Sequence, residues 1–515
     1  MSTGPVTVLP NDEHNQKLVA NVHPPTWVNP DPSGRYNMVV IGAGAAGLIT
    51  AVVSASLGAK VALIEKHLMG GDCLNVGCVP SKGMIRAARA WADIKRAEEF
   101  GVHVPAGVQY DFAAVMERMR KLRARISHMD SAHRYKSLGV DVYIGSARFA
   151  DAETITVEGH AGQQKLKFTK AAICTGARAV TPPTPGLKEA GYLTNETIFT
   201  LTELPRKVGV IGAGPVGCEL AQAFARFGSE VYLVEATHGI MPNEDRDAAE
   251  IVLKSMQRDG VQLLCCGREL NIEKTATGKR MTVHSHAKQY DVMVDEILIG
   301  VGRMPNVEGL NLESVGVAYD TQGVKVNAHL QTTNPRIYAA GDICSKYKFT
   351  HAADAMAQIV IQNALFPHPF GLGRASVEDL IMPWATFTEP EIAHVGMHEK
   401  DATERGLQVE TYTLKLDAID RAILDGEEEG FARVHIQKGT DKVLGATIVA
   451  AHAGDMIGEF SVLMKAGAGA GTLAATIHPY PTQADVNRHV INLWRKAHFT
   501  DRTKKILKWL FSIMR

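Results

Sequence analysis

GGDCLNVGCVPSK, residues 70–82, contains two cysteines five positions apart, Cys73 and Cys78, with glycines before and between them. Pro80 and the alanine-rich run after it predict a helix that begins near Cys78. The dipole at a helix N-terminus favours a thiolate and lowers the pKa of a cysteine placed there. The glycines, Gly71 among them, indicate close packing of the backbone on a flat ligand. We therefore interpret the two cysteines as a reactive pair, with a pair of buried structural cysteines as the alternative.

A dinucleotide-binding pattern directly precedes this stretch. Residues 37–41 are predicted to form a buried strand that runs into the glycine motif GAGAAG, residues 42–47. A helix and a second strand, residues 60–64, follow and end at Glu65. Such a motif allows a pyrophosphate to approach a helix N-terminus, and the acid can accept a hydrogen bond from a ribose hydroxyl. The three glycines of the motif are Gly42, Gly44 and Gly47.

A second unit of the same kind begins at residue 207, which indicates that the chain binds two dinucleotides. The motif GAGPVG, residues 212–217, follows a predicted strand, and the next strand ends at Glu235. Glu235 would repel a 2′-phosphate and accept a hydrogen bond from a free 2′-hydroxyl, and the next arginine is Arg246. This pattern favours NADH over NADPH as the second nucleotide. The glycines of this motif are Gly212, Gly214 and Gly217.

Three later segments complete the predicted organisation. Residues 300–306 are a glycine-rich crossing point that leads back to the first domain, and they include Gly302 and Arg303. A strand from residue 336 ends at Gly341-Asp342, so the acid is predicted at the carboxyl end of a strand beside a ligand crevice. Beyond residue 380, strands alternate with helices in a pattern typical of an α+β domain.

Composition limits the classes of function. The chain has 515 residues, which corresponds to about three domains. It has 55 basic and 55 acidic residues, so no net charge attracts a nucleic acid, and we expect no nucleic-acid partner. Seven cysteines are too few and too scattered for a secreted disulfide framework. With no signal peptide and no stretch of ~18 apolar residues, the sequence indicates a cytoplasmic protein.

Both ends of the chain differ from the central part. The first 35 residues are polar and contain prolines, and we expect an extension that is partly disordered. Residues 503–515 form a basic, aromatic-rich, amphipathic tail. It would lie either on the protein or its dimer mate or, as a peripheral contact, on a membrane surface.

Another cysteine pair, Cys265-Cys266, lies on a strand predicted over residues 261–266. Adjacent cysteines rarely form a useful disulfide, so we interpret this pair as structural. We predict no metal-binding site.

These motifs resemble those of the flavin-dependent pyridine nucleotide–disulfide oxidoreductases, from about residue 36 to about residue 495. The cysteine run is the most specific feature, and Thr175-Gly176, Gly341-Asp342 and residues 387–391, FTEPE, occur in the same order as in that family. The resemblance implies an α/β fold with two Rossmann-like dinucleotide-binding domains, for FAD and NAD(P), and a C-terminal α+β dimerisation domain. It therefore implies a homodimer.

The resemblance also implies domain boundaries. These are an extension over 1–35, an FAD domain over 36–190, an NAD(P) domain over 191–305, a central FAD segment over 306–375, a dimerisation domain over 380–498 and the tail over 499–515.

Site residues are likewise carried over from the resemblance. Cys78 would form a charge-transfer contact with the flavin, Cys73 would attack the substrate, and Lys82 would pair with Glu219 near the reactive edge of the flavin. The remaining contacts implied are with FAD at Gly42, Gly44, Gly47, Glu65, Gly176 and Asp342, and with the nicotinamide nucleotide at Gly212, Gly214, Gly217 and Glu235. Gly71, Gly302 and Arg303 are further predicted cofactor-binding residues.

A C-terminal motif distinguishes the branches of this family. Glutathione and lipoamide reductases carry His-Pro-Thr-x-x-Glu, whose histidine acts from the partner subunit as acid/base. Here Tyr480 takes the place of the histidine and Asp485 that of the glutamate, and His478 lies two residues earlier. The tyrosine resembles that of mercuric reductase, but no cysteine follows Cys344, so the metal-delivering cysteine pair of that enzyme is absent. Tyrosine, with a pKa of about 10, is a poor base at neutral pH, so His478 is a candidate acid/base, with a structural histidine as the alternative.

The hypothesis is an NAD(P)H-dependent FAD flavoprotein reductase with a redox-active Cys73–Cys78 disulfide. Its substrate would be a small disulfide or a thiophilic metal ion. The alternatives are a dihydrolipoamide-type dehydrogenase, a mercury or copper ion reductase, and a flavin-bearing redox sensor at a membrane surface.

Overall fold

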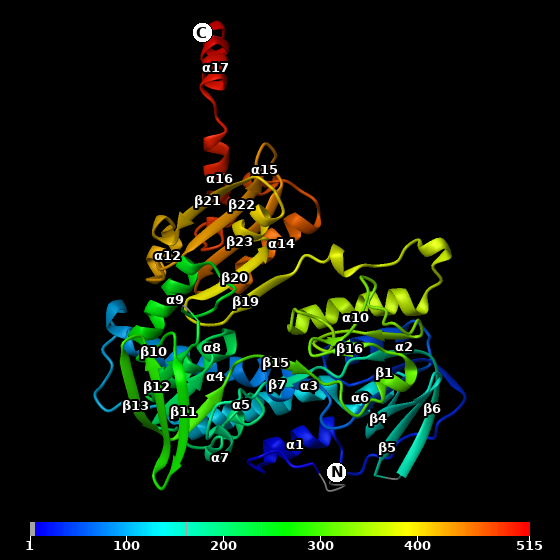
Figure 1. Cartoon of the computed structure of the whole chain (residues 1–515). Coiled ribbons are helices and arrows are strands. Elements are labelled where there is room, and N and C mark those ends of the chain that lie inside the picture. The colour runs from blue at the N-terminus through cyan, green and yellow to red at the C-terminus, as the bar shows by residue number, and fades with distance from the viewer. Residues whose placement is uncertain (1–5, 161, 238) are drawn as a thin grey trace. The chain divides into compact units, whose positions relative to one another are not determined.

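The computed structural model describes residues 6–160, 162–237 and 239–515 (Figure 1). The chain divides into two compact units. The first contains the residues up to 236 and residues 262–380, and the second contains residues 237–261 and 381–515. The segment 237–261, which carries α9 (Arg246–Arg258), therefore belongs with the C-terminal part of the chain.

A mostly parallel sheet forms the core of the first unit. Its strand order is β3-β2-β1-β6-β5-β4, and β18 also pairs with β6. The buried apolar runs of the central strands explain the parallel arrangement, because both faces of the sheet are covered. Helices α2 (Ala45–Ser56) and α10 (Thr350–Leu365) pack against each other beside it. The strands are β1 (Arg35–Ile41), β2 (Val61–Glu65), β3 (Val140–Ile144), β4 (Ser146–Asp151), β5 (Thr154–Gly159), β6 (Gly162–Ile173) and β18 (Ile337–Ala339).

A second parallel sheet in the same unit has the order β10-β9-β8-β14. Helix α8 (Pro215–Arg226) connects β8 to β9, which reproduces the strand–helix–strand unit expected from the sequence. An antiparallel sheet, β11-β12-β13, adjoins it. The strands are β8 (Lys207–Ile211), β9 (Glu230–Val234), β10 (Val261–Leu264), β11 (Arg268–Thr275), β12 (Gly278–Ser285), β13 (Lys288–Val294) and β14 (Glu296–Ile299).

The second unit is built on an antiparallel sheet of order β19-β20-β23-β22-β21. Helices α14 (Gly458–Lys465) and α16 (Asp485–Ala497) bury apolar side chains with those of the sheet, and Phe460 is fully buried among them. The strands are β19 (Pro383–Thr386), β20 (Glu391–Gly396), β21 (Val409–Lys415), β22 (Phe431–Gln437) and β23 (Val443–Ala450).

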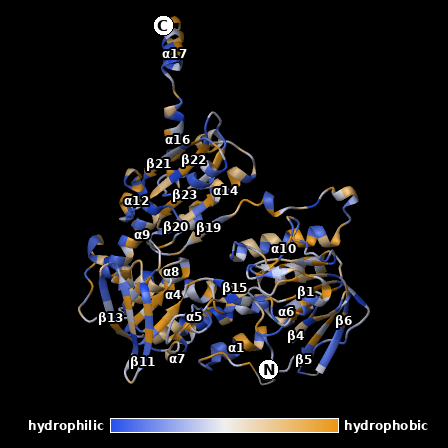
Figure 2. Ribbon diagram, viewed as in Figure 1, coloured by the Kyte–Doolittle hydropathy of each residue, from blue (hydrophilic) through white to orange (hydrophobic). Residues whose placement is uncertain are grey.

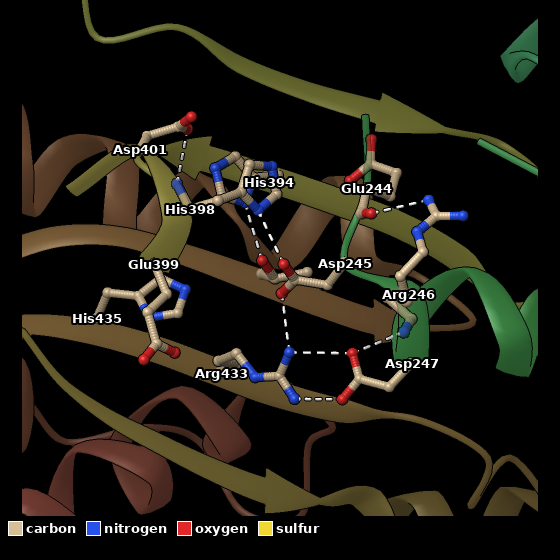
Figure 3. Close-up of polar contacts among 12 residues, drawn as sticks. Glu244, Asp245, Arg246, Asp247, His394, His398, Glu399, Asp401, Arg433 and His435 are labelled. Carbon is tan, nitrogen blue, oxygen red and sulfur yellow. Dashed lines mark hydrogen bonds and ion pairs between the residues drawn. The ribbon is translucent and has the colours of Figure 1, made fainter. Parts of the chain in front are cut away.

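A buried polar cluster attaches the segment before α9 to the sheet of the second unit (Figure 3). Asp245 accepts hydrogen bonds from Arg433 at 2.8 Å and from His398 Nδ1 at 3.2 Å. The His398 and His394 rings stack with their centroids 3.7 Å apart. Burial lowers the pKa of His394 to about 3 and that of His435 to about 4, so both rings are neutral at physiological pH.

Part of the N-terminal extension is folded onto the first unit. Among the described residues, Glu13–Val22 form helix α1, capped by Asp12, whose carboxylate accepts a hydrogen bond from Asn15 N at 2.8 Å. Leu18 is fully buried in the core of the first sheet. Arg123 donates a hydrogen bond to Asn15 Oδ1 at 2.7 Å, which ties the extension to α5 (Phe112–Ile126). These contacts anchor an otherwise polar segment, and residues 1–5 of the predicted extension lie outside the described residues.

Helix α17 (Asp501–Ile513) lies at the other end of the chain and buries none of its residues (Figure 1). Both hydrophobic and hydrophilic residues occur along it, as Figure 2 shows. None of the helices in the described part of the chain is both long enough and apolar enough to cross a bilayer.

Candidate active site

The first glycine motif forms a tight turn between β1 and α2. Gly42 has φ 100°, a conformation that favours glycine, and a Cβ on Gly47 would lie 1.8 Å from the Gly42 carbonyl oxygen. Glu65, at the end of β2, accepts hydrogen bonds from Ala43 N and His67 N, each at 2.8 Å. Burial raises the pKa of the Glu65 carboxyl, and these two N–H donors oppose the rise.

The cysteine stretch packs directly on this turn. Gly70 N donates a hydrogen bond to Ala43 O at 2.8 Å. A Cβ on Gly71 would lie 2.6 Å from Gly44 Cα, so only glycine permits the observed approach. The stretch then forms helix α3 (Gly71–Asn75), which carries Cys73, and helix α4 (Cys78–Lys95). The two cysteines therefore lie beside the glycine turn.

The two thiols differ in acidity. Cys78 is the first residue of α4, it is exposed, and its sulfur lies 3.7 Å from Thr350 Oγ1. A hydrogen bond from Cys73 stabilises the Cys78 thiolate, and together with Thr350 and the charge of Lys82 it lowers the Cys78 pKa to about 6, against the opposing effect of partial desolvation. The same hydrogen bond, together with burial, raises the pKa of Cys73. Cys78 is thus the thiolate of the reduced pair at neutral pH.

Lys82 lies one turn after Cys78 on α4 and pairs with Glu219 of α8. The Lys82 Nζ–Glu219 Oε2 distance is 2.7 Å, and the Glu219 side chain is only 6% exposed. The predicted pairing of these two residues is therefore present in the structure. It joins the helix of the cysteine stretch to the helix that follows the second glycine motif.

Arg303 connects three separate segments around the first glycine turn. It donates a hydrogen bond to Asp72 of the cysteine stretch, and its Nε lies 3.3 Å from Asp342 Oδ2. Burial raises the pKa of Asp342, and the nearby Arg303 charge opposes the rise. Asn306 N donates to Gly176 O at 3.0 Å, so Gly176, Gly302, Arg303 and Asp342 gather at one end of the sheet. Sequence reasoning missed Asp72 and Thr350 as members of this group.

The second glycine motif repeats the geometry of the first. Gly212 has φ 106°, and a Cβ on Gly217 would lie 1.9 Å from the Gly212 carbonyl oxygen. Gly214 caps α8, and nothing lies within 4 Å of the position that a Cβ on it would occupy. Glu235 follows β9 and is only 7% exposed.

The two residues at the acid/base motif positions near the C-terminus, Tyr480 and Asp485, do not hydrogen-bond to each other. Tyr480 is 75% exposed, and its hydroxyl donates a hydrogen bond to Asp420 at 2.8 Å, which raises the Tyr480 pKa. Asp485 pairs instead with Arg488 at 2.8 Å and His489 at 3.1 Å. A Tyr480–Asp485 pair is therefore absent from the described structure.

His478 has a different partner. Its Nε2 lies 3.0 Å from Glu459 Oε2, and the His478 side chain is only 4% exposed. Asn487 Nδ2 donates to the same carboxylate oxygen at 3.1 Å, which fixes the orientation of Glu459. Sequence reasoning missed Glu459, because this α14 residue lies outside the motif. A histidine–glutamate pair thus exists, built from residues other than those at the motif positions.

The residues at the two glycine turns fit two dinucleotides. Each turn holds a crowded glycine pair whose Cβ-free backbone leaves the N–H groups of a helix N-terminus accessible to a pyrophosphate. Each is followed by a carboxylate at the end of the second strand, Glu65 or Glu235. The cysteine pair lies beside the first turn, which is therefore the turn that would hold the adenine dinucleotide portion of FAD.

Family models match most of the chain. The model described as pyridine nucleotide-disulphide oxidoreductase matches residues 36–357, and the model for the dimerisation domain of the same family matches residues 382–490. The mercuric reductase of Staphylococcus aureus is 33% identical over 453 residues, which cover 88% of this chain and 81% of that protein. The dihydrolipoyl dehydrogenase of Bacillus subtilis (strain 168) is 34% identical over 451 residues, 87% of this chain and 94% of that protein.

Solved structures of related proteins have the same fold. The solved structure of the Cu(II) complex of the HOCl-induced flavoprotein disulfide reductase RclA from Escherichia coli superposes on this chain with a TM-score of 0.78 and 28% sequence identity. The matched residues cover 90% of this chain and 100% of the RclA chain. LpdA from Mycobacterium tuberculosis has a TM-score of 0.80 and 26% identity, covering 89% of this chain and 99% of that one.

We predict that Cys78 of the reduced protein reacts with iodoacetamide at a rate that is half-maximal near pH 6, because only the thiolate is nucleophilic. Thr350→Val removes the hydroxyl contact with the Cys78 sulfur and should shift this midpoint to higher pH. Mass spectrometry of the alkylated peptide gives the rate at each pH. A wild-type midpoint near the ordinary cysteine value of about 8.5 would contradict the assignment of Cys78 as the thiolate.

Proposed function

Because this chain belongs to the pyridine nucleotide–disulfide oxidoreductase family, we propose that it is an NADH-dependent flavoprotein reductase with Cys73 and Cys78 as its redox-active pair. Members of this family bind FAD and use a pyridine nucleotide, and they act on sulfur groups. The observation that carries the proposal is the contact of the cysteine stretch with the first glycine turn, Gly71 against Gly44. Bound FAD supplies a two-electron carrier between the nicotinamide and the sulfur pair.

The chain's own residues would carry out the sulfur chemistry. Cys73 gives its proton to the acid/base, and the resulting thiolate attacks one sulfur of a substrate disulfide to form a mixed disulfide. The acid/base passes that proton to the displaced sulfur, which leaves as the first substrate thiol. The Cys78 thiolate then attacks Cys73 and closes the Cys73–Cys78 disulfide, and the second substrate sulfur leaves with a proton from solvent. The substrate gains two electrons and two protons, and the pair loses two electrons. The charge of Lys82, which Glu219 holds in position, stabilises the Cys78 thiolate.

NADH is the proposed hydride donor. Glu235 directly follows β9, and a carboxylate at this position of a dinucleotide-binding unit supports a hydrogen bond from a ribose 2′-hydroxyl. A 2′-phosphate in the same position would face a carboxylate at close range, and the resulting repulsion disfavours NADPH.

The proposed substrate is a small disulfide or a thiophilic metal ion. Similarity to mercuric reductase supports the metal ion, and similarity to dihydrolipoyl dehydrogenase supports the disulfide. A soft metal ion would be bound by both thiolates of the reduced pair, which is the ligand chemistry such ions prefer.

A homodimer agrees with the match to the dimerisation domain. In the family as outlined from the sequence, the partner subunit contributes the acid/base. We propose that His478 has this role here, because Glu459 fixes its ring and because Tyr480 is held by Asp420 with a raised pKa.

The exposed helix α17 favours a second activity of the chain, contact with an anionic membrane surface through residues 503–515. Trp509, Phe511 and Ile513 are 62%, 57% and 63% exposed, and Lys504, Lys505 and Lys508 lie on the same helix. An exposed apolar and aromatic set beside several cations is complementary to anionic lipids.

The proposed reaction predicts that Cys73→Ser and Cys78→Ser lower kcat/KM for NADH-dependent disulfide reduction by about a thousandfold or more, because neither variant can form the disulfide. FAD content should be unchanged in both. The assay compares lipoamide, glutathione disulfide and Hg²⁺ as substrates. Equal turnover of a disulfide by wild type and Cys73→Ser would overturn the proposal.

For the acid/base, we predict that His478→Gln lowers kcat by about a hundredfold and removes one ionisation from the pH profile of kcat. Glu459→Gln should also lower kcat, because it removes the carboxylate that orients the ring. His489→Gln, which changes an exposed histidine on α16, should behave as wild type. If Tyr480→Phe causes the loss instead and His478→Gln does not, the role assigned to His478 is wrong.

For the tail, we predict that the full chain floats with vesicles containing phosphatidylserine at low salt, whereas a chain ending at residue 500 does not. Changing Trp509 and Phe511 to Ser should weaken binding as strongly as changing Lys504, Lys505 and Lys508 to Gln. Equal flotation of the full and shortened chains would contradict a membrane role for residues 503–515.

A further inference from the structure

Three side chains with metal-binding atoms meet at a position away from the cysteine stretch. These atoms are the sulfurs of Cys265 and Cys266 and one ring nitrogen of His286, and all lie within 4.8 Å of one another. The two sulfurs are 3.4 Å apart, and both residues are present as thiols. Among the described residues, no other three histidine, cysteine or acidic side chains bring their ligand atoms this close together.

The fold brings these residues together through two turns. Strand β10 ends at Leu264, earlier than the strand predicted over residues 261–266, so Cys265 and Cys266 lie in the turn before β11. His286 lies in the turn between β12 and β13. Ser285 Oγ donates a hydrogen bond to Cys265 O at 2.6 Å, which holds one turn against the other.

The backbone at two of the three residues supports the arrangement. Cys266 has φ 56° and His286 has φ 52°, the left-handed conformation that residues with a Cβ seldom adopt. In that conformation, Cys266 directs its sulfur beside that of Cys265. The sequence interpretation of this pair as structural considered only a disulfide between adjacent cysteines, and a metal site needs no such bond.

We propose that Cys265, Cys266 and His286 bind a thiophilic d10 cation such as Zn²⁺. In tetrahedral sites, Zn–S distances are about 2.3 Å and Zn–N distances about 2.0 Å, which place the ligand atoms about 3.3–4 Å from one another. The observed spacing requires little movement to reach this geometry. On binding, the two thiols release their protons and form two metal–thiolate bonds, with no change in oxidation state.

The place of the site in the fold agrees with this assignment, because Ser285 holds the two turns together. The turn is also bonded to the Glu235 backbone, since Gly267 N donates to Glu235 O at 2.7 Å and Glu235 N to Leu264 O at 3.2 Å. The metal site therefore adjoins the acid assigned to the nicotinamide nucleotide. Three protein ligands leave one position open to water or another small ligand.

The test is a titration of the reduced holoprotein with Zn²⁺ in competition with a chromophoric chelator. Cys73→Ser and Cys78→Ser are introduced first, so that the redox pair cannot bind the probe. This reference protein should bind one Zn²⁺ per chain. Adding Cys265→Ser and Cys266→Ser should abolish that binding, and adding His286→Asn should weaken it at least about tenfold.

Asparagine is chosen at position 286 because it tolerates positive φ, so this variant keeps the turn. His284→Asn is the matched control. His284 lies on the same hairpin, is exposed and pairs with Glu269 at 2.9 Å, and its variant should bind Zn²⁺ as the reference does. The proposal is overturned if the reference shows no saturable site, if the two cysteine changes leave the affinity unaltered, or if His284→Asn weakens binding as much as His286→Asn.

Discussion

The contact between two glycines, Gly71 of the cysteine stretch and Gly44 of the first glycine turn, is the constraint on which the site depends. A Cβ on Gly71 would lie 2.6 Å from Gly44 Cα, so any larger residue would push the two segments apart. The hydrogen bond from Gly70 N to Ala43 O fixes the same approach. Because α4 begins only a few residues later, this backbone contact determines where the Cys78 sulfur lies relative to the nucleotide-binding turn.

Electrostatics then separates the roles of the two cysteines. The hydrogen bond between them stabilises a thiolate at Cys78 and a protonated thiol at Cys73, and Lys82 and Thr350 reinforce the difference. Lys82 can act in this way because Glu219 holds it at 2.7 Å. The Lys82–Glu219 ion pair therefore links α4, which begins at the Cys78 thiolate, to α8, which follows the second glycine motif.

The local motifs could be predicted from the sequence, whereas contacts between distant segments could not. Each glycine motif is identified by a strand, a turn and an acid within one short stretch. By contrast, the contacts of Arg303 with Asp72 and of Thr350 with Cys78 join residues far apart in the chain. Glu459 was missed for the same reason, since the family motif directs attention to Asp485. The capping residue Asp12 was a local signal for α1, but the polar composition around it obscured the helix.

The most direct measurement is an anaerobic titration of the FAD-bound protein with NADH, and then with NADPH, followed by visible absorbance. The account predicts a long-wavelength charge-transfer band after two electrons per flavin, from the Cys78 thiolate beside oxidised FAD, with NADH as the better titrant. Direct bleaching of the flavin without that band would show that the cysteine pair does not exchange electrons with it, and it would contradict the central claim.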